Sequence, residues 1–143
     1  VEMTTKQYLN QIRDAKHDIE KLQARIRDKR ALLTSISVNS NDVRVQSSSD
    51  PDKMASMVAN ILDMESELKD SVDKSLELER KITKEIDKIK GEKYKDVLFW
   101  RYVQGYTFEM IAVTTSYSYR QTIRIHGEAL LEFQNMFGDE YKS

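Results

Sequence analysis

Residues 107–125 decide the fold, and they read TFEMIAVTTSYSYRQTIRI. Thr107 is a typical N-cap residue, and apolar residues follow it at the spacing of one helix face: Phe108, Ile111 and Ala112. Residues 115–117 predict a tight turn, after which Ser118 predicts the cap of the next helix. Two helices joined by so short a turn form a helix-turn-helix.

The second of these helices is predicted to run from Tyr119 to about Met136. Its inward face carries Thr122, Ile125, Ala129 and Phe133. An aromatic-rich helix from about Tyr94 to Tyr102 is predicted to precede the motif and to end at Gly105, which supplies a left-handed C-cap. These elements make up a predicted C-terminal domain, residues 92–143.

Residues 3–91 are predicted to form a helical hairpin. Apolar residues recur every seven positions in two segments, Thr4–Ile36 and Pro51–Lys90, as in a coiled coil. The rows of the first segment are Ile12, Ile19, Ile26, Leu33 and Tyr8, Ala15, Leu22, Ile36; those of the second are Met54, Ile61, Leu68, Ile82, Ile89 and Met57, Met64, Leu78. The polar stretch Ser37–Pro51 between them predicts a loop.

We expect the two long helices to pack antiparallel, and a parallel homodimer through the same seams is the competing geometry. The apolar rows of Pro51–Lys90 form the second seam, and three polar residues interrupt it: Ser71, Ser75 and Glu85. Three residues beside it, Val58, Val72 and Ile86, widen its apolar stripe, so a second copy of the chain is the expected partner for that surface.

The composition restricts the fold class and the kinds of site that the chain can hold. One proline, four glycines and one third charged residues favour an all-α protein, and the lack of cysteine excludes disulfides and thiolate metal sites. No run reaches the roughly 18 apolar residues that span a bilayer, and the first residues lack a secretory apolar run, so we expect a cytoplasmic location. No catalytic constellation, cofactor site, metal site or small-molecule substrate is predicted. His126 is expected on the helix surface or at a phosphate.

Two stretches also carry a family resemblance. The run WRYVQGYTFEMIA, residues 100–112, and the run YSYRQTIRIHGEAL, residues 117–130, resemble region 4 of sigma-70-type factors. The chain from Met3 onward is more closely similar to a family of small phage and prophage sigma-like transcription regulators from Gram-positive bacteria. The resemblance implies that Ser118–Leu131 is a recognition helix in a bacterial host cell, with double-stranded DNA as its partner.

The residues expected to contact DNA are Ser118, Tyr119, Arg120, Gln121 and Arg124. Arginine can bind guanine and glutamine can bind adenine, each through two hydrogen bonds in the major groove. The sequence predicts an accessory transcription regulator, because no aromatic-bearing region 2 that could melt promoter DNA precedes the motif. RNA polymerase or its sigma factor is then an expected second partner.

Two other functions remain open from the residues. The basic and acidic residues from Lys93 onward are equal in number, so a lone domain is expected to bind DNA weakly. A degenerate helix-turn-helix used as a protein-docking module would show no salt-sensitive DNA affinity. A structural assembly protein such as a small terminase subunit would form rings, because such proteins also combine a helix-turn-helix with an oligomerising hairpin.

Overall fold

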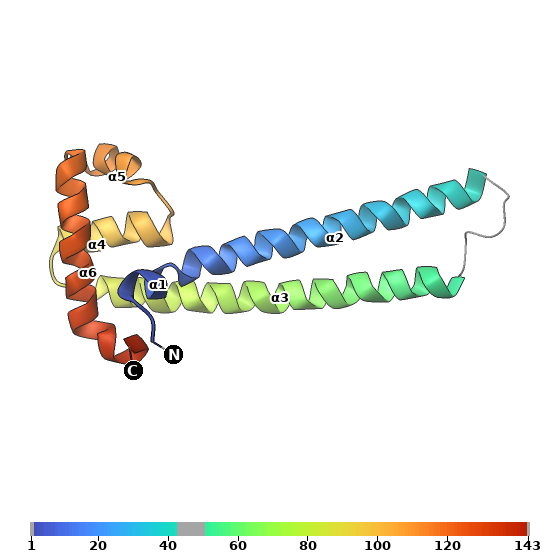
Figure 1. Cartoon of the computed structure of the whole chain (residues 1–143), viewed down its shortest axis with the longest axis horizontal. Helices are drawn as coiled ribbons and strands as arrows, with labels where there is room; N and C mark the ends of the chain where they lie inside the picture. The colour runs from blue at the N-terminus through green and yellow to red at the C-terminus, as the bar shows by residue number, and fades with distance from the viewer. Residues whose placement is uncertain (1, 43–50, 143) are drawn as a thin grey trace. The chain divides into compact units, whose positions relative to one another are not determined.

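The computed structural model describes residues 2–42 and 51–142, and every regular element in these ranges is a helix. The predicted all-α class is therefore confirmed. The helices are α1 (Thr5–Leu9), α2 (Gln11–Asp42), α3 (Pro51–Asp87), α4 (Glu92–Leu98), the π-helix η2 (Phe99–Val103), α5 (Phe108–Thr115) and α6 (Tyr119–Lys142). Figure 1 labels the α-helices.

The first helical segment begins as its sequence predicts but is broken once. Thr4 caps α1 through a capping box, in which its hydroxyl accepts from the Gln7 amide at 3.1 Å and its own amide donates to Gln7 Oε1 at 2.9 Å. The helix then stops at Asn10, so the expected single helix Thr4–Ile36 is two helices, α1 and α2.

Residues at both ends of the predicted loop Ser37–Pro51 are helical instead. Residues 37–42 continue α2, and residues 43–50 lie outside the described part of the chain. Pro51 begins α3, where its fixed φ suits the first helical turn. That helix ends at Asp87 rather than at Lys90, and Gly91 follows with a φ of 105°, which favours glycine.

Contacts divide the chain into two units, which we call the two-helix unit (Lys16–Lys74) and the head unit (Val1–Ala15 with Ser75–Ser143). The sequence placed the division at residues 91 and 92. The structure places it elsewhere because residues at both ends of the predicted hairpin share one core with the C-terminal helices. Each unit is described by itself.

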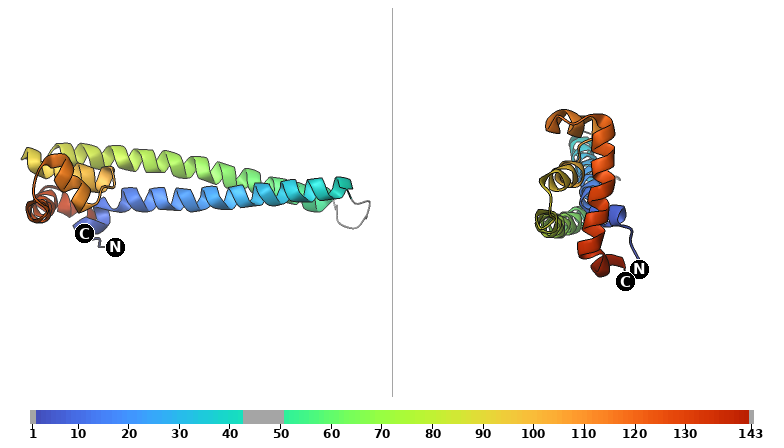
Figure 2. Two further views of the ribbon diagram at one scale, coloured as in Figure 1. Left: turned by 90° about the horizontal axis from the view of Figure 1, so that it is seen from above. Right: turned by 90° about the vertical axis from the view of Figure 1, so that its left-hand side faces the viewer.

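In the two-helix unit, α2 and α3 run side by side in opposite directions, both in Figure 1 and in the left-hand view of Figure 2. Leu22, Ile26 and Met64 form a buried cluster with Leu68 packed against it. All four belong to the predicted heptad rows, so the periodicity identified the contacting faces. Arg30 and Glu65 add an ion pair across the two helices at the surface.

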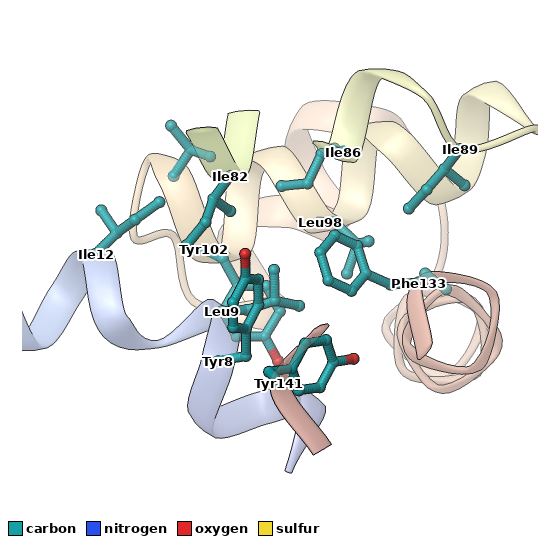
Figure 3. Close-up of a cluster of buried hydrophobic side chains, with 12 residues drawn as sticks. Tyr8, Leu9, Ile12, Ile82, Ile86, Ile89, Leu98, Tyr102, Phe133 and Tyr141 are labelled. Carbon is teal, nitrogen blue, oxygen red and sulfur yellow. The ribbon is translucent and has the colours of Figure 1, made fainter. Parts of the chain in front are cut away.

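In the head unit, α6 contacts α1, α4 and α5, which are arranged along its length in the right-hand view of Figure 2. The main core gathers residues from α1, α2, α3, α4, η2 and α6 (Figure 3). Its buried members are Tyr8, Leu9, Ile12, Ile82, Ile86, Ile89, Leu98, Tyr102, Val103, Ala129, Phe133 and Tyr141.

The first and last described helices of the chain are tied together in this core. The Met3 amide donates to the Tyr141 carbonyl at 3.1 Å, and the hydroxyls of Thr5 and Tyr141 lie 2.8 Å apart. The rings of Tyr8 and Tyr141 stack with centroids 4.4 Å apart. Sequence periodicity contains no signal for such a contact between residues so far apart in the chain.

Two residues on or beside the apolar seam of α3 differ from their prediction. Ile86, expected on an apolar surface for a partner, is only 1% exposed because it packs in the head-unit core. Glu85, expected to weaken the seam, is buried there, and its Oε1 accepts a hydrogen bond from the Tyr8 hydroxyl at 2.6 Å. Burial raises the pKa of the Glu85 carboxyl, while the bond from Tyr8 lowers it.

Replacing Tyr8 by phenylalanine should lower the free energy of unfolding by about 1–3 kcal/mol, because the buried Glu85 carboxyl would lose the hydrogen bond that the Tyr8 hydroxyl donates. Tyr141→Phe is the matched control, since it also removes one phenolic hydroxyl, but from a bond to the neutral Thr5 hydroxyl. It should cost only about 0.5–1.5 kcal/mol. Urea denaturation measures both. Equal losses would show that the Tyr8–Glu85 bond contributes nothing particular to stability.

Candidate nucleic-acid interface

The segment before the motif contains a π-helix that the sequence did not predict. The expected continuous helix from Tyr94 to Tyr102 is α4 followed by η2, whose widened turn is closed by the Gln104 amide donating to the Phe99 carbonyl at 3.0 Å. Gly105 follows with a φ of 76°, so the predicted left-handed conformation is confirmed. The Tyr106 amide then bonds to the Trp100 carbonyl at 2.8 Å.

Arg101 links this segment to α5, a role that sequence reasoning missed. Its Nη1 donates to the Tyr106 carbonyl at 3.1 Å, and its guanidinium lies 4.2 Å from the ring centroid of Phe108. The first contact fixes the connection and the second is a cation–π contact to the start of α5. The sequence shows the aromatic residues Tyr106 and Phe108, but it does not show the turn that brings them to Arg101.

The two helices of the motif are held at their ends by the predicted caps. The Thr107 hydroxyl accepts from the Met110 amide at 3.2 Å at the start of α5. Ser116 ends that helix with a φ of 63°, a left-handed conformation that is uncommon outside glycine. The Ser118 hydroxyl accepts from the Gln121 amide at 3.0 Å at the start of α6. Residues 116–118 therefore connect the helices in one tight turn.

The inward faces of α5 and α6 are those that the spacing predicted. Ile111 and Thr122 are fully buried, and Ile125 is buried in a second cluster with Val97 and Ile111. Partly buried aromatic residues surround that cluster: Tyr94, Trp100, Tyr106, Phe108 and Tyr117. The buried Thr122 hydroxyl has a hydrogen-bond partner, because it donates to the Ser118 carbonyl at 2.9 Å. This packing fixes which face of α6 remains at the surface.

The surface face of α6 begins with the predicted contact residues. Tyr119 is 51% exposed, Ile123 is 38% exposed, and Arg120 and Arg124 are also exposed. These four line a shallow depression of about 390 Å³. Within the described residues, neither of the two guanidinium groups forms an ion pair. Two cationic groups and one aliphatic side chain are thus presented together on one helix face.

Gln121 has a structural role that its predicted one did not include. Its Oε1 accepts a hydrogen bond from the Ser118 amide at 3.2 Å, which completes a capping box with the Ser118 hydroxyl. To bind adenine, Gln121 would use both the oxygen and the nitrogen of its side-chain amide. The hydrogen bond from the Ser118 backbone amide to Gln121 Oε1 would then have to break. Ser118 is likewise occupied as a cap. The arginines are therefore the better placed of the five predicted contact residues.

His126 is not at the helix surface, which corrects the expectation for this residue. It is only 7% exposed, its Nε2 lies 2.7 Å from the Tyr102 hydroxyl, and its ring meets Phe108 edge-on at 4.8 Å. Burial lowers the pKa of the imidazole to about 4, and the charges of Lys6 and Arg101 act in the same direction. The imidazole is therefore a neutral core group, placed between η2, α5 and α6.

Two further features concern ligands and membranes. Among the residues that the structure describes, no three His, Cys, Asp or Glu side chains are grouped so that they could hold a metal ion. None of the helices, over their described residues, is long and apolar enough to cross a membrane.

No family model, curated protein or solved structure matches the chain.

Proposed function

We propose that this protein is a DNA-binding transcription regulator of the phage type, whose α5 and α6 form a helix-turn-helix like region 4 of sigma factors. In this proposal α6 is the recognition helix, and α2 and α3 form an antiparallel coiled-coil hairpin. The hairpin or the aromatic segment α4–η2 would contact RNA polymerase or its sigma factor. The bacterial cytoplasm is the corresponding location.

The observation that carries the proposal is the pair of exposed arginines on the first turns of α6. Arg120 and Arg124 lie one turn apart on the surface face, while the opposite face is fixed by Thr122 and Ile125 in the core. A recognition helix presents its amino-terminal residues to base edges in the same way. Arginine can make two hydrogen bonds to guanine, and the exposed Ile123 offers an apolar surface of the kind that contacts the thymine methyl group.

Replacing Arg120 or Arg124 by alanine should weaken binding to selected DNA by about 1–3 kcal/mol, because a base contact is lost. Loss of a base contact should relax preference at one base position. Loss of a phosphate contact should instead weaken binding to all sequences alike and reduce the slope of affinity against salt by about one. Genomic-fragment selection followed by footprinting supplies the DNA, and titrations at several salt concentrations measure the affinity.

Folding separates this effect from a general loss of structure. Either arginine variant should keep its free energy of unfolding within about 0.5 kcal/mol, because both residues are exposed. Ile125→Ala is the control on the opposite face, and it should cost about 2–5 kcal/mol of stability by opening a cavity. Arginine variants that bind as tightly and selectively as the parent would show that α6 does not read bases.

The same titrations distinguish the other two functions. A parent protein without salt-sensitive affinity for any selected DNA would favour a docking module, for which the exposed Val113 and Met110 on α5 provide apolar surface. Ring-shaped oligomers that bind packaging sites would favour a small terminase subunit. A dimer that protects a promoter fragment is the result expected from our proposal.

A further inference from the structure

One of the four glycines has no role that the chain itself explains. Gly91 and Gly105 have positive φ angles, of 105° and 76°, which favour glycine. At Gly138 a Cβ atom would lie 3.2 Å from the Cγ atom of Gln134, so this glycine leaves room for a neighbouring side chain. Gly127 has neither reason. Its φ is not positive, and apart from the backbone of its own helix a Cβ atom there would meet no atom of the described residues within 4 Å.

Gly127 is also in the interior of a helix, where glycine is a destabilising residue. It is exposed within α6, which runs from Tyr119 to Lys142. Glycine loses more backbone freedom on folding than alanine does, so alanine at this position would favour the helix. The reason for a glycine here therefore comes from outside the chain, and a partner that approaches the helix backbone too closely for a side chain supplies one.

The neighbours of Gly127 on the surface of α6 indicate which partner this is. Gly127 comes three residues after Arg124 and four after Ile123, so it borders both side chains. These two residues line the shallow depression at the start of α6 together with a second arginine. The nearest acid in sequence, Glu128, accepts a hydrogen bond from the Tyr94 hydroxyl at 3.3 Å. The surface beside Gly127 is thus cationic, which matches the charge of DNA phosphates.

We propose that double-stranded DNA approaches the backbone of α6 at Gly127, so that the recognition surface continues from Arg120 as far as this glycine. The inference rests on the proposed DNA-binding function and adds a contact position to it. A helix with its side chains is about 10–12 Å across and the major groove is about 12 Å wide, so a missing side chain lets the helix enter more deeply. Deeper entry brings the Arg124 guanidinium, one turn before Gly127, closer to the base edges.

Replacing Gly127 by alanine should have effects of opposite sign on folding and on binding. The midpoint of urea denaturation should rise, because alanine favours the helix. Affinity for DNA selected with the parent protein should fall by about 10-fold, because an added methyl group in a close-packed interface forces the two surfaces apart. Gly127→Leu carries a larger side chain that also favours the helix. It should raise the midpoint again and lower the affinity by about 100-fold.

Gly138→Ala is the matched control, because it adds the same methyl group to the same helix, about three turns further on. It should keep the DNA affinity within about 2-fold of the parent value. Three results would overturn the inference: Gly127 variants that bind as tightly as the parent, a lower urea midpoint in Gly127→Ala, or an equal loss of affinity in Gly138→Ala. If the Gly127 variants bind normally while the Arg120 and Arg124 variants do not, only this inference fails. A parent without affinity for any selected DNA overturns the proposed function as well.

Discussion

Replacing Phe133 by alanine should lower the free energy of unfolding by about 3–5 kcal/mol, the largest effect of any single substitution that we describe. Phe133 lies on α6 and is fully buried where that helix meets the core residues of Figure 3. Its ring centroid is 5.0 Å from that of Phe137 and 5.8 Å from that of Tyr8. Alanine would leave a cavity bounded by several helices, which cannot collapse without moving them.

Met136→Ala is the control, because Met136 is on the same helix and 45% exposed. It should change stability by no more than about 0.5 kcal/mol. Urea denaturation followed by circular dichroism, at one fixed protein concentration, measures both variants. A Phe133→Ala protein as stable as Met136→Ala would refute the central position of this ring.

Acid should destabilise the protein through His126. The pKa of this imidazole is lowered to about 4 in the fold by burial, against an ordinary value of about 6.5 in the unfolded chain. The unfolded state therefore binds the proton more readily, and the stabilising contribution is fully present above pH 6.5. It is lost as the pH falls from about 6.5 towards 4. Between about pH 7.5 and pH 5 the loss should be about 2 kcal/mol.

His126→Gln isolates this effect, because glutamine does not titrate in the range. The variant should be less stable at neutral pH, yet its stability should fall less between about pH 7.5 and pH 5 than that of the parent. The Glu85 carboxyl, whose raised pKa gives a change of opposite sign, is present in both proteins. The same slope in His126→Gln and in the parent would contradict the assignment.

Much of the helical pattern could be predicted because it depends on residues close together in the chain. The heptad rows identified Leu22, Ile26 and Met64 as contact residues, and the spacing in α6 identified Ile125 and Phe133 as buried. Caps at two positions were also predicted, since the signal at each is one hydroxyl side chain before an apolar run: Thr107 and Ser118. Such signals need no knowledge of the distant chain.

The unit boundary and the polar core groups could not be predicted in this way. Glu85 interrupts an apolar row, and the hydrogen bond that Tyr8 donates to it from another helix offsets part of the cost of its burial. His126 lies on the face next to the predicted inward row, and Tyr102 from η2 is what satisfies its ring. The break at Asn10 also has no local signal, since no proline or glycine occurs there.

The candidate site was predicted more completely than the core around it. Exposure of Tyr119, Arg120 and Arg124 follows from the period of α6 once its inward face is known. The competition at Gln121, whose side chain caps the helix, was missed although the sequence carries its signal: a serine followed three residues later by a glutamine is the signature of a capping box. The DNA-binding role of these residues stays a prediction until the titrations are made.

The link between Met3 and Tyr141 has a consequence for biosynthesis. A ribosome adds about 5–20 residues per second and generally allows amino-terminal parts to fold first. Residues 16–74 can pair while later residues are still being added, because their partners are all within that range. The segment around Tyr8 has to wait until α6 has emerged, since Phe133 and Tyr141 complete its surroundings. The apolar side chains of this segment are therefore fully buried only after almost the whole chain has been made.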